Sequence, residues 1–199
     1  MTAYSDARIY GGTGSILVIL TVVPTVGWVL GIAGFILILL ALKRLSSELG
    51  DRHIFTNAII SVIFAIIAVA VSAILVIVIF LHYVGVNYPN GFSYMLGQSP
   101  NLGTVNWSAV AIALIPSLLV TWIFLILSGY FIRQSYRSIA TKLNIPLFET
   151  GALIYFIGAI TVIIMIGFLL LLVAQIIIAV AFLSIPDRVS ATSGPISNA

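Results

Sequence analysis

Four long runs of apolar residues, separated by short polar segments, dominate the chain. The two central runs, Ile54–Val84 and Trp107–Ile132, lie in a stretch from residue 53 to 132 that contains no Asp, Glu, Lys or Arg. Each run is longer than the roughly 20 residues that a helix needs to cross a hydrocarbon core about 30 Å thick. The pattern therefore predicts two membrane-spanning helices. The uncharged polar loop between them, Gly85–Asn106, is either a lid over the bundle or an inert connection.

The first apolar run, Gly14–Leu42, would be about 43 Å long as a single helix. Pro24 near its middle lacks a backbone donor, and Gly27 favours a helix end. Two interpretations remain open. The run is a helical hairpin of about residues 5–23 and 27–45, or it is one tilted helix with a kink at Pro24. We favour the hairpin.

The last apolar run, Gly151–Ile185, is also too long for one crossing. Gly167 is the expected turn, which gives spans near Leu147–Ile164 and Phe168–Ser184. The predicted fold class is therefore an all-α membrane protein, a polytopic transmembrane helix bundle of six spans arranged as hairpin, span, span and hairpin. The alternative is four spans, with long kinked first and last helices. Residues 1–186 form one transmembrane helical domain, and residues 187–199 are a disordered polar tail.

The composition supports lipid as the solvent. Hydrophobic residues make up 62% of the chain and charged residues 7%, whereas a soluble domain has about 25% charged residues on average. The sequence has no cysteine, which excludes disulfides and thiolate metal sites. Nucleic acid is not an expected partner, because no cluster holds more than three basic residues and none is interleaved with stacking aromatics.

The distribution of basic residues predicts the orientation in the membrane. Lys43, Arg44 and Arg52 flank the connector after the first hairpin, and connectors rich in Lys and Arg stay in the cytoplasm. We therefore expect a protein of the cell membrane with both termini in the cytoplasm and the loop 85–106 outside. With six spans all eight basic residues lie inside, whereas four spans would place Arg8 and Arg188 outside.

Signals for helix ends fit this plan. Gly50 suits the C-cap of the second helix, and Asp51 can cap the third by accepting bonds from its free amides. Pro146 fits the first position of a new helix. Glu149 follows in the first turn, where a negative charge complements the helix dipole.

The segment after the fourth span is amphipathic. Apolar residues recur at helical spacing on one side and basic residues occupy the other: Ile132, Tyr136, Ile139 and Leu143 against Arg133, Arg137 and Lys142. We expect this segment to lie on the inner headgroups, where each basic group contributes about 1 kcal/mol near an anionic surface.

Small residues at steps of three and four predict the faces through which the helices pack. The candidates are Gly27, Gly31, Gly34, Ser61, Ala65, Ala68, Ser72, Ala109, Ala113 and Ser117. The glycines of the first hairpin could form a dimerisation face or pack within the monomer, and we favour packing within the monomer.

Pro116 lies inside the fourth span and frees the carbonyl of Ile112 from its helical bond. We expect Ser117 or Thr121 to help repair the local bonding. A broken helix in mid-membrane can mark a transport site, but we favour a simple bend.

Three polar side chains within or beside apolar runs are candidate functional residues: Glu149, Gln175 and His82. For Glu149 we favour a structural role, at the helix dipole or paired with Arg133, over proton coupling. Gln175 is expected to bond a neighbouring helix. A metal role for His82 would need a second histidine, and His53 is predicted on the other side of the membrane, so we favour an interfacial position.

The sequence offers no residue set for a catalytic, cofactor or metal site, since it has no HExxH motif and no paired carboxylates. We therefore expect no enzyme and no cofactor. We expect a structural or accessory protein of membrane complexes, packing through its small-residue faces; a channel or carrier for a neutral solute or lipid is the alternative. The spans hold no ionisable group of the kind that usually marks transport. Expected partners are membrane lipids and a homo-oligomer or larger membrane complex.

Two blocks of sequence resemble an uncharacterised, largely archaeal family of membrane proteins, domain of unknown function 996. The blocks are Tyr10–Leu17, Pro24-x-x-Gly27 and Gly31-x-x-Gly34-x-Ile36-Leu37 leading to Ala41–Lys43, and then Ile139-Ala140, Phe148-x-Thr150–Leu153-x-Tyr155-x-Ile157–Ala159 and Ala179-x-Ala181-Phe182. The resemblance covers about residues 9–186. It implies a multi-pass membrane protein and no particular activity or site.

Overall fold

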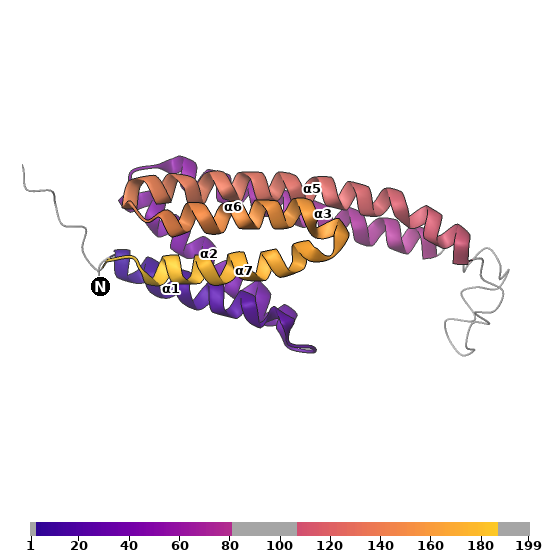
Figure 1. The fold of residues 1–199 in the computed structure, drawn as a ribbon, viewed down its shortest axis with the longest axis horizontal. Helices are drawn as coiled ribbons and strands as arrows, with labels where there is room; N and C mark the ends of the chain where they lie inside the picture. The colour runs from indigo at the N-terminus through magenta and orange to yellow at the C-terminus, as the bar shows by residue number, and fades with distance from the viewer. Residues whose placement is uncertain (1–2, 81–106, 187–199) are drawn as a thin grey trace, which may run out of the picture. The chain divides into compact units, whose positions relative to one another are not determined.

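The computed structural model describes residues 3–80 and 107–186, and all regular elements of this part of the chain are helices (Figure 1). The elements are α1 (Ala3–Ile19), the short 3-10 helix η1 (Leu20–Val22), α2 (Gly27–Glu48), α3 (Arg52–Phe80), α5 (Trp107–Leu143), α6 (Pro146–Thr161), the 3-10 helix η4 (Val162–Ile164) and α7 (Ile166–Leu183). Five of the helices are long and apolar enough to cross a membrane. The predicted fold class, an all-α polytopic bundle, is confirmed. Predictions for the loop 85–106, His82 and the tail fall outside the described residues.

The first apolar run forms a hairpin, as the interpretation that we favoured predicts. α1 and α2 pack along each other and are joined by η1 and a turn in which Thr25 has a φ of 72°. Gly14 and Gly34 face each other across the pair. A Cβ atom added to Gly34 would lie 2.5 Å from the carbonyl oxygen of Gly14. The two backbones are therefore in direct contact, which only glycine permits.

The last apolar run forms a second hairpin of α6 and α7, but its turn is not at Gly167. The left-handed residue is Met165, with a φ of 67°, at the end of η4. Gly167 lies in the first turn of α7, where a Cβ atom would overlap the backbone of Val162 and Gly158. The glycine is required by this close approach of two backbones and not by the turn itself.

The contacts divide the chain into two compact units, residues 1–61 with 129–199 and residues 62–128. The core of the first unit contains three aromatic rings. The centroids of Phe148 and Phe182 are 5.0 Å apart, and Tyr136 lies 5.8 Å from Phe148 and 6.2 Å from Phe182. All three side chains are buried, as is Ile139.

This core corrects the prediction for the amphipathic segment. The segment continues α5 without a break, and its apolar side packs against α6 and α7. Inside it, the Ser135 hydroxyl donates a bond of 2.7 Å to the carbonyl of Ile54 in α3. The apolar side therefore faces protein and not the headgroups.

The second unit consists of the pair formed by residues 62–80 of α3 and 107–128 of α5. Phe64 and Phe124 meet with ring centroids 6.0 Å apart. Pro116 does not interrupt α5. The Ser117 hydroxyl donates to the carbonyl of Leu114 at 2.7 Å, and Thr121 donates to that of Ser117 at 2.8 Å. Both hydroxyls therefore bond backbone carbonyls next to Pro116, although neither bonds the Ile112 carbonyl that the proline frees.

Candidate functional site

Seven charged side chains of the first unit lie where α2 and α5 end and where α3 and α6 begin. We call this region the charged end and define it by Lys43, Arg44, Asp51, Arg52, Arg137, Lys142 and Glu149. The chain turns sharply there in two places. Gly50 has a φ of 62° and Asn144 a φ of 54°, and these are the residue types that adopt the left-handed conformation most easily.

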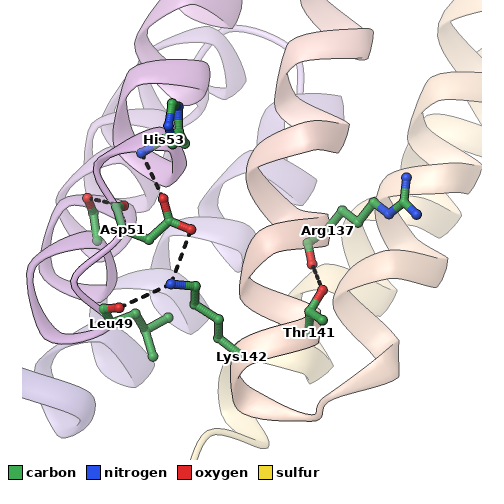
Figure 2. Close-up of polar contacts among 7 residues, drawn as sticks. Leu49, Asp51, His53, Arg137, Thr141 and Lys142 are labelled. Carbon is green, nitrogen blue, oxygen red and sulfur yellow. Dashed lines mark hydrogen bonds and ion pairs between the residues drawn. The ribbon is translucent and has the colours of Figure 1, made fainter.

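Asp51 and Lys142 fix the connector between α2 and α3 (Figure 2). Lys142 Nζ lies 3.4 Å from Asp51 Oδ2 and donates to the carbonyl of Leu49 at 3.3 Å. The other carboxylate oxygen, Oδ1, accepts a bond of 3.0 Å from the backbone N–H of His53. Asp51 is therefore the N-cap of α3, as predicted, and it also holds α3 to the end of α5.

The two roles of Asp51 can be separated by mutation. Asp51→Asn keeps an oxygen for the His53 amide but removes the charge, whereas Asp51→Ala removes both. Because loss of an N-cap costs about 1 kcal/mol, we expect the alanine variant to be less stable than the asparagine variant by about that amount. Equilibrium unfolding in mixed detergent micelles measures the difference. Equal stability of the two variants would show that the cap contributes nothing.

The second ion pair of the charged end joins Arg137 and Glu149, with Nε and Oε1 3.6 Å apart. Both side chains are more than half exposed, so solvent screens the pair. The predicted pair of Glu149 with Arg133 is wrong, and Arg133 makes a different contact. Its guanidinium instead lies over the ring of Phe156, 5.6 Å from the centroid, where the aromatic face attracts a cation.

Gln175 does not meet the partner that the sequence predicted for it. The side chain is 8% exposed in α7, and its Nε2 has no hydrogen-bond partner among the residues that the structure describes. The buried hydroxyl of Ser15 in α1 also has no hydrogen-bond partner among these residues. α1 packs on α7, with Gly11 against the Phe182 ring. Ser15 is one helical turn from Gly11, and Gln175 is two turns from Phe182.

We expect Gln175→Leu to stabilise the protein, because a buried donor without a partner costs about 1–3 kcal/mol. The gain should appear as a higher midpoint of unfolding in detergent. Ser184→Ala is the control on the same helix, since its exposed hydroxyl bonds only the carbonyl of Val180. A loss of stability in Gln175→Leu would mean that the amide makes a bond that the protein needs.

The small residues divide between the two units. Gly27, Gly31 and Gly34 all lie against α1, η1 or their connecting turn in the same chain. Of the candidates on α3 and α5, Ser61, Ala68 and Ser117 are buried, and Ala65, Ser72, Ala109 and Ala113 are half-buried.

Sequence reasoning missed two glycines on α6 that lie against α7. Gly151 lies against Ile177 and Ile178, and Gly158 lies against Leu171. Their spacing of seven residues, two helical turns, was the signal that could have found them. Among the described residues, no three His, Asp or Glu side chains are grouped as metal ligands.

Residues 30–176 match the family described as protein of unknown function DUF996. The chain belongs to this family. It is also similar to the uncharacterized protein MJ1644 of Methanocaldococcus jannaschii, with 33% identity over 183 residues that cover 92% of this chain and 93% of the relative. No solved structure matches the chain.

The DUF996 match confirms the family expected from the sequence. The match begins within α2 and ends within α7, so it includes the charged end and both long helices. The opening block at Tyr10–Leu17 lies outside the matched residues. The five long apolar helices of this DUF996 protein are those of a multi-pass membrane protein.

Proposed function

We propose that this protein is a non-catalytic accessory component of the membrane that assembles with its own copies or with a larger membrane complex through α3 and α5. The observation that supports the proposal is the second unit. Among the residues of this unit whose burial the structure describes, only Ala68, Ser117 and Ser128 are buried, while Ala65 and Ser72 on one face remain half-buried. Small residues on a lipid-facing surface let another helix approach closely.

The assembly proposal can be tested by enlarging these small residues. Ala65→Leu and Ser72→Leu should dissociate the assembly, while Ile66→Leu on the exposed side of the same helix should leave it unchanged. The protein is purified in native lipid discs, and its mass and co-purifying subunits are determined by light scattering and mass spectrometry. A monomeric wild-type protein without co-purifying subunits would refute the proposal.

The proposed orientation places the charged end and both termini in the cytoplasm of the cell, with the 85–106 loop outside. Six basic residues lie at or beside the charged end: Lys43, Arg44, Arg52, Arg133, Arg137 and Lys142. Basic residues near span ends are retained on the cytoplasmic side.

A carrier for a neutral solute is the second candidate. The buried Ser15 hydroxyl and Gln175 Nε2, which have no partner within the described part of the chain, favour it. Neutral donors in an apolar bundle suit a hydrogen-bonding substrate without charge. We expect proteoliposomes to show no ion conductance, because residues 53–132 contain no Asp, Glu, Lys or Arg. A selective conductance would reverse the order of the two candidates.

A further inference from the structure

The turns of both hairpins expose apolar side chains. Val22 and Val26 in the first turn are 65% and 52% exposed, and Ile164 and Met165 in the second are 59% and 75% exposed. No Asp, Glu, Lys or Arg occurs in residues 9–42 or 150–186. A turn that emerged into water on the far side of a membrane would leave these side chains in water, which is unfavourable.

Part of the backbone of each turn is hydrogen-bonded within the turn itself. In the first, Val23 donates to the carbonyl of Leu20 and Gly27 to that of Val23; in the second, Met165 donates to Val162 and Phe168 to Met165. Pro24 has no N–H to satisfy. Because hydrocarbon offers no partner to a backbone group, these internal bonds lower the cost of placing a turn inside a bilayer.

The charge-free lengths of two hairpin arms are short compared with those of α3 and α5. From Lys43 to Gly27, α2 covers about 24 Å. From Glu149 to Ile164, α6 and η4 together also cover about 24 Å. Arg133 lies beside Phe156, and from Phe156 to Ile164 only about 14 Å remain. Each of these lengths is below the hydrocarbon thickness of about 30 Å.

α3 and α5 differ from the hairpins in length. From Arg52 to Phe80 α3 extends about 42 Å, and from Arg133 to Trp107 α5 extends about 39 Å. These lengths span the hydrocarbon and reach into the interfacial layers, which bring the bilayer to about 40–45 Å. Trp107 is exposed at the end of α5, and tryptophan is enriched at membrane interfaces.

We propose that both hairpins are re-entrant. They enter the bilayer from the charged end, turn back within the hydrocarbon, and have their turns covered by lipid acyl chains. Only α3 and α5 cross the bilayer completely. This assignment replaces six complete crossings with two, keeps both termini on the side of the charged end, and is independent of the assembly proposal.

The absence of cysteine from the chain makes the assignment testable by site-directed spin labelling. Val22→Cys and Ile164→Cys carry the label at the turns, with Val26→Cys and Ile163→Cys as second positions should either variant fail to fold. Ser47→Cys at the charged end and Ser108→Cys beside Trp107 are exposed controls. The full chain is reconstituted in vesicles of phosphatidylcholine and phosphatidylglycerol, and collision of each label with oxygen and with a water-soluble nickel chelate is measured.

We expect oxygen, which concentrates in acyl chains, to reach the turn labels, and the nickel chelate to reach only the two controls. Access of the nickel chelate to a turn label, at the level found for Ser108→Cys, would show that the hairpin crosses and would overturn the assignment. A turn label reached by neither reagent, even after dilution of the protein in lipid, would show that protein covers the turn, which also overturns it.

Discussion

Gly34→Ala is expected to destabilise the first hairpin by about 3 kcal/mol, at the upper end of the usual cost of overpacking. The added methyl group would lie 2.5 Å from the carbonyl oxygen of Gly14 and 2.8 Å from the backbone nitrogen of Val18. Both are backbone atoms of α1, so relief requires the two helices to move apart along their length. Equilibrium unfolding in detergent micelles measures the loss.

Gly31→Ala is the matched control, because it adds the same methyl group on the same helix. Its nearest neighbour is the Thr21 hydroxyl at 2.7 Å, the end of an exposed side chain that can rotate away. Since alanine also favours a helix over glycine by roughly 0.5–1 kcal/mol, we expect little change or a small gain. If both variants lose the same stability, direct contact between the backbones does not hold the hairpin together.

The sequence predicted the hairpins because each contains too many apolar residues for one helix and a break near its middle. It misplaced the second turn because glycine is favoured in two different situations: where the backbone is left-handed and where two backbones approach closely. At Gly167 the need is close approach, and Met165 takes the left-handed conformation. The sequence alone does not distinguish these two reasons for a glycine, because the difference depends on how α7 packs against η4 in three dimensions.

The prediction for the amphipathic segment of α5 was wrong for a related reason. Apolar residues on one side and basic residues on the other describe a helix on the headgroups and a helix against a bundle equally well. The choice depends on whether α6 and α7 return to cover Tyr136 and Ile139, and that is a long-range contact without a local signal.

For the candidate polar residues, too, the sequence predicts local contacts but not contacts between distant parts of the chain. Asp51 was predictable as a cap because a cap acts on the next residues of its own chain, and His53 is its partner. The partner of Glu149 depends on the rotation of α5 against α6, which selects Arg137 over Arg133. A partner for Gln175 depends on which polar groups of other helices reach α7, which the pattern of residues does not specify.

Phe182→Ala is expected to lower the free energy of unfolding by about 3–5 kcal/mol, the usual cost of removing a buried aromatic ring. Its ring is fully buried, contacts Phe148 and Tyr136, and lies against Gly11 of α1. It therefore joins four helices, and the neighbours cannot all close the cavity. Phe168→Ala on the exposed side of the same helix should change stability by less than about 1 kcal/mol.

A double mutant shows whether Phe182 is also the reason for the glycine at position 11. A Cβ atom on Gly11 would overlap the Phe182 ring, so Gly11→Ala alone should be strongly destabilising. In the Phe182→Ala background the ring is gone, and the added methyl group enters the cavity. We therefore expect the two changes together to cost less than their sum by more than about 1 kcal/mol, a coupling typical of residues in contact. Additive costs would show that α1 does not pack on this ring.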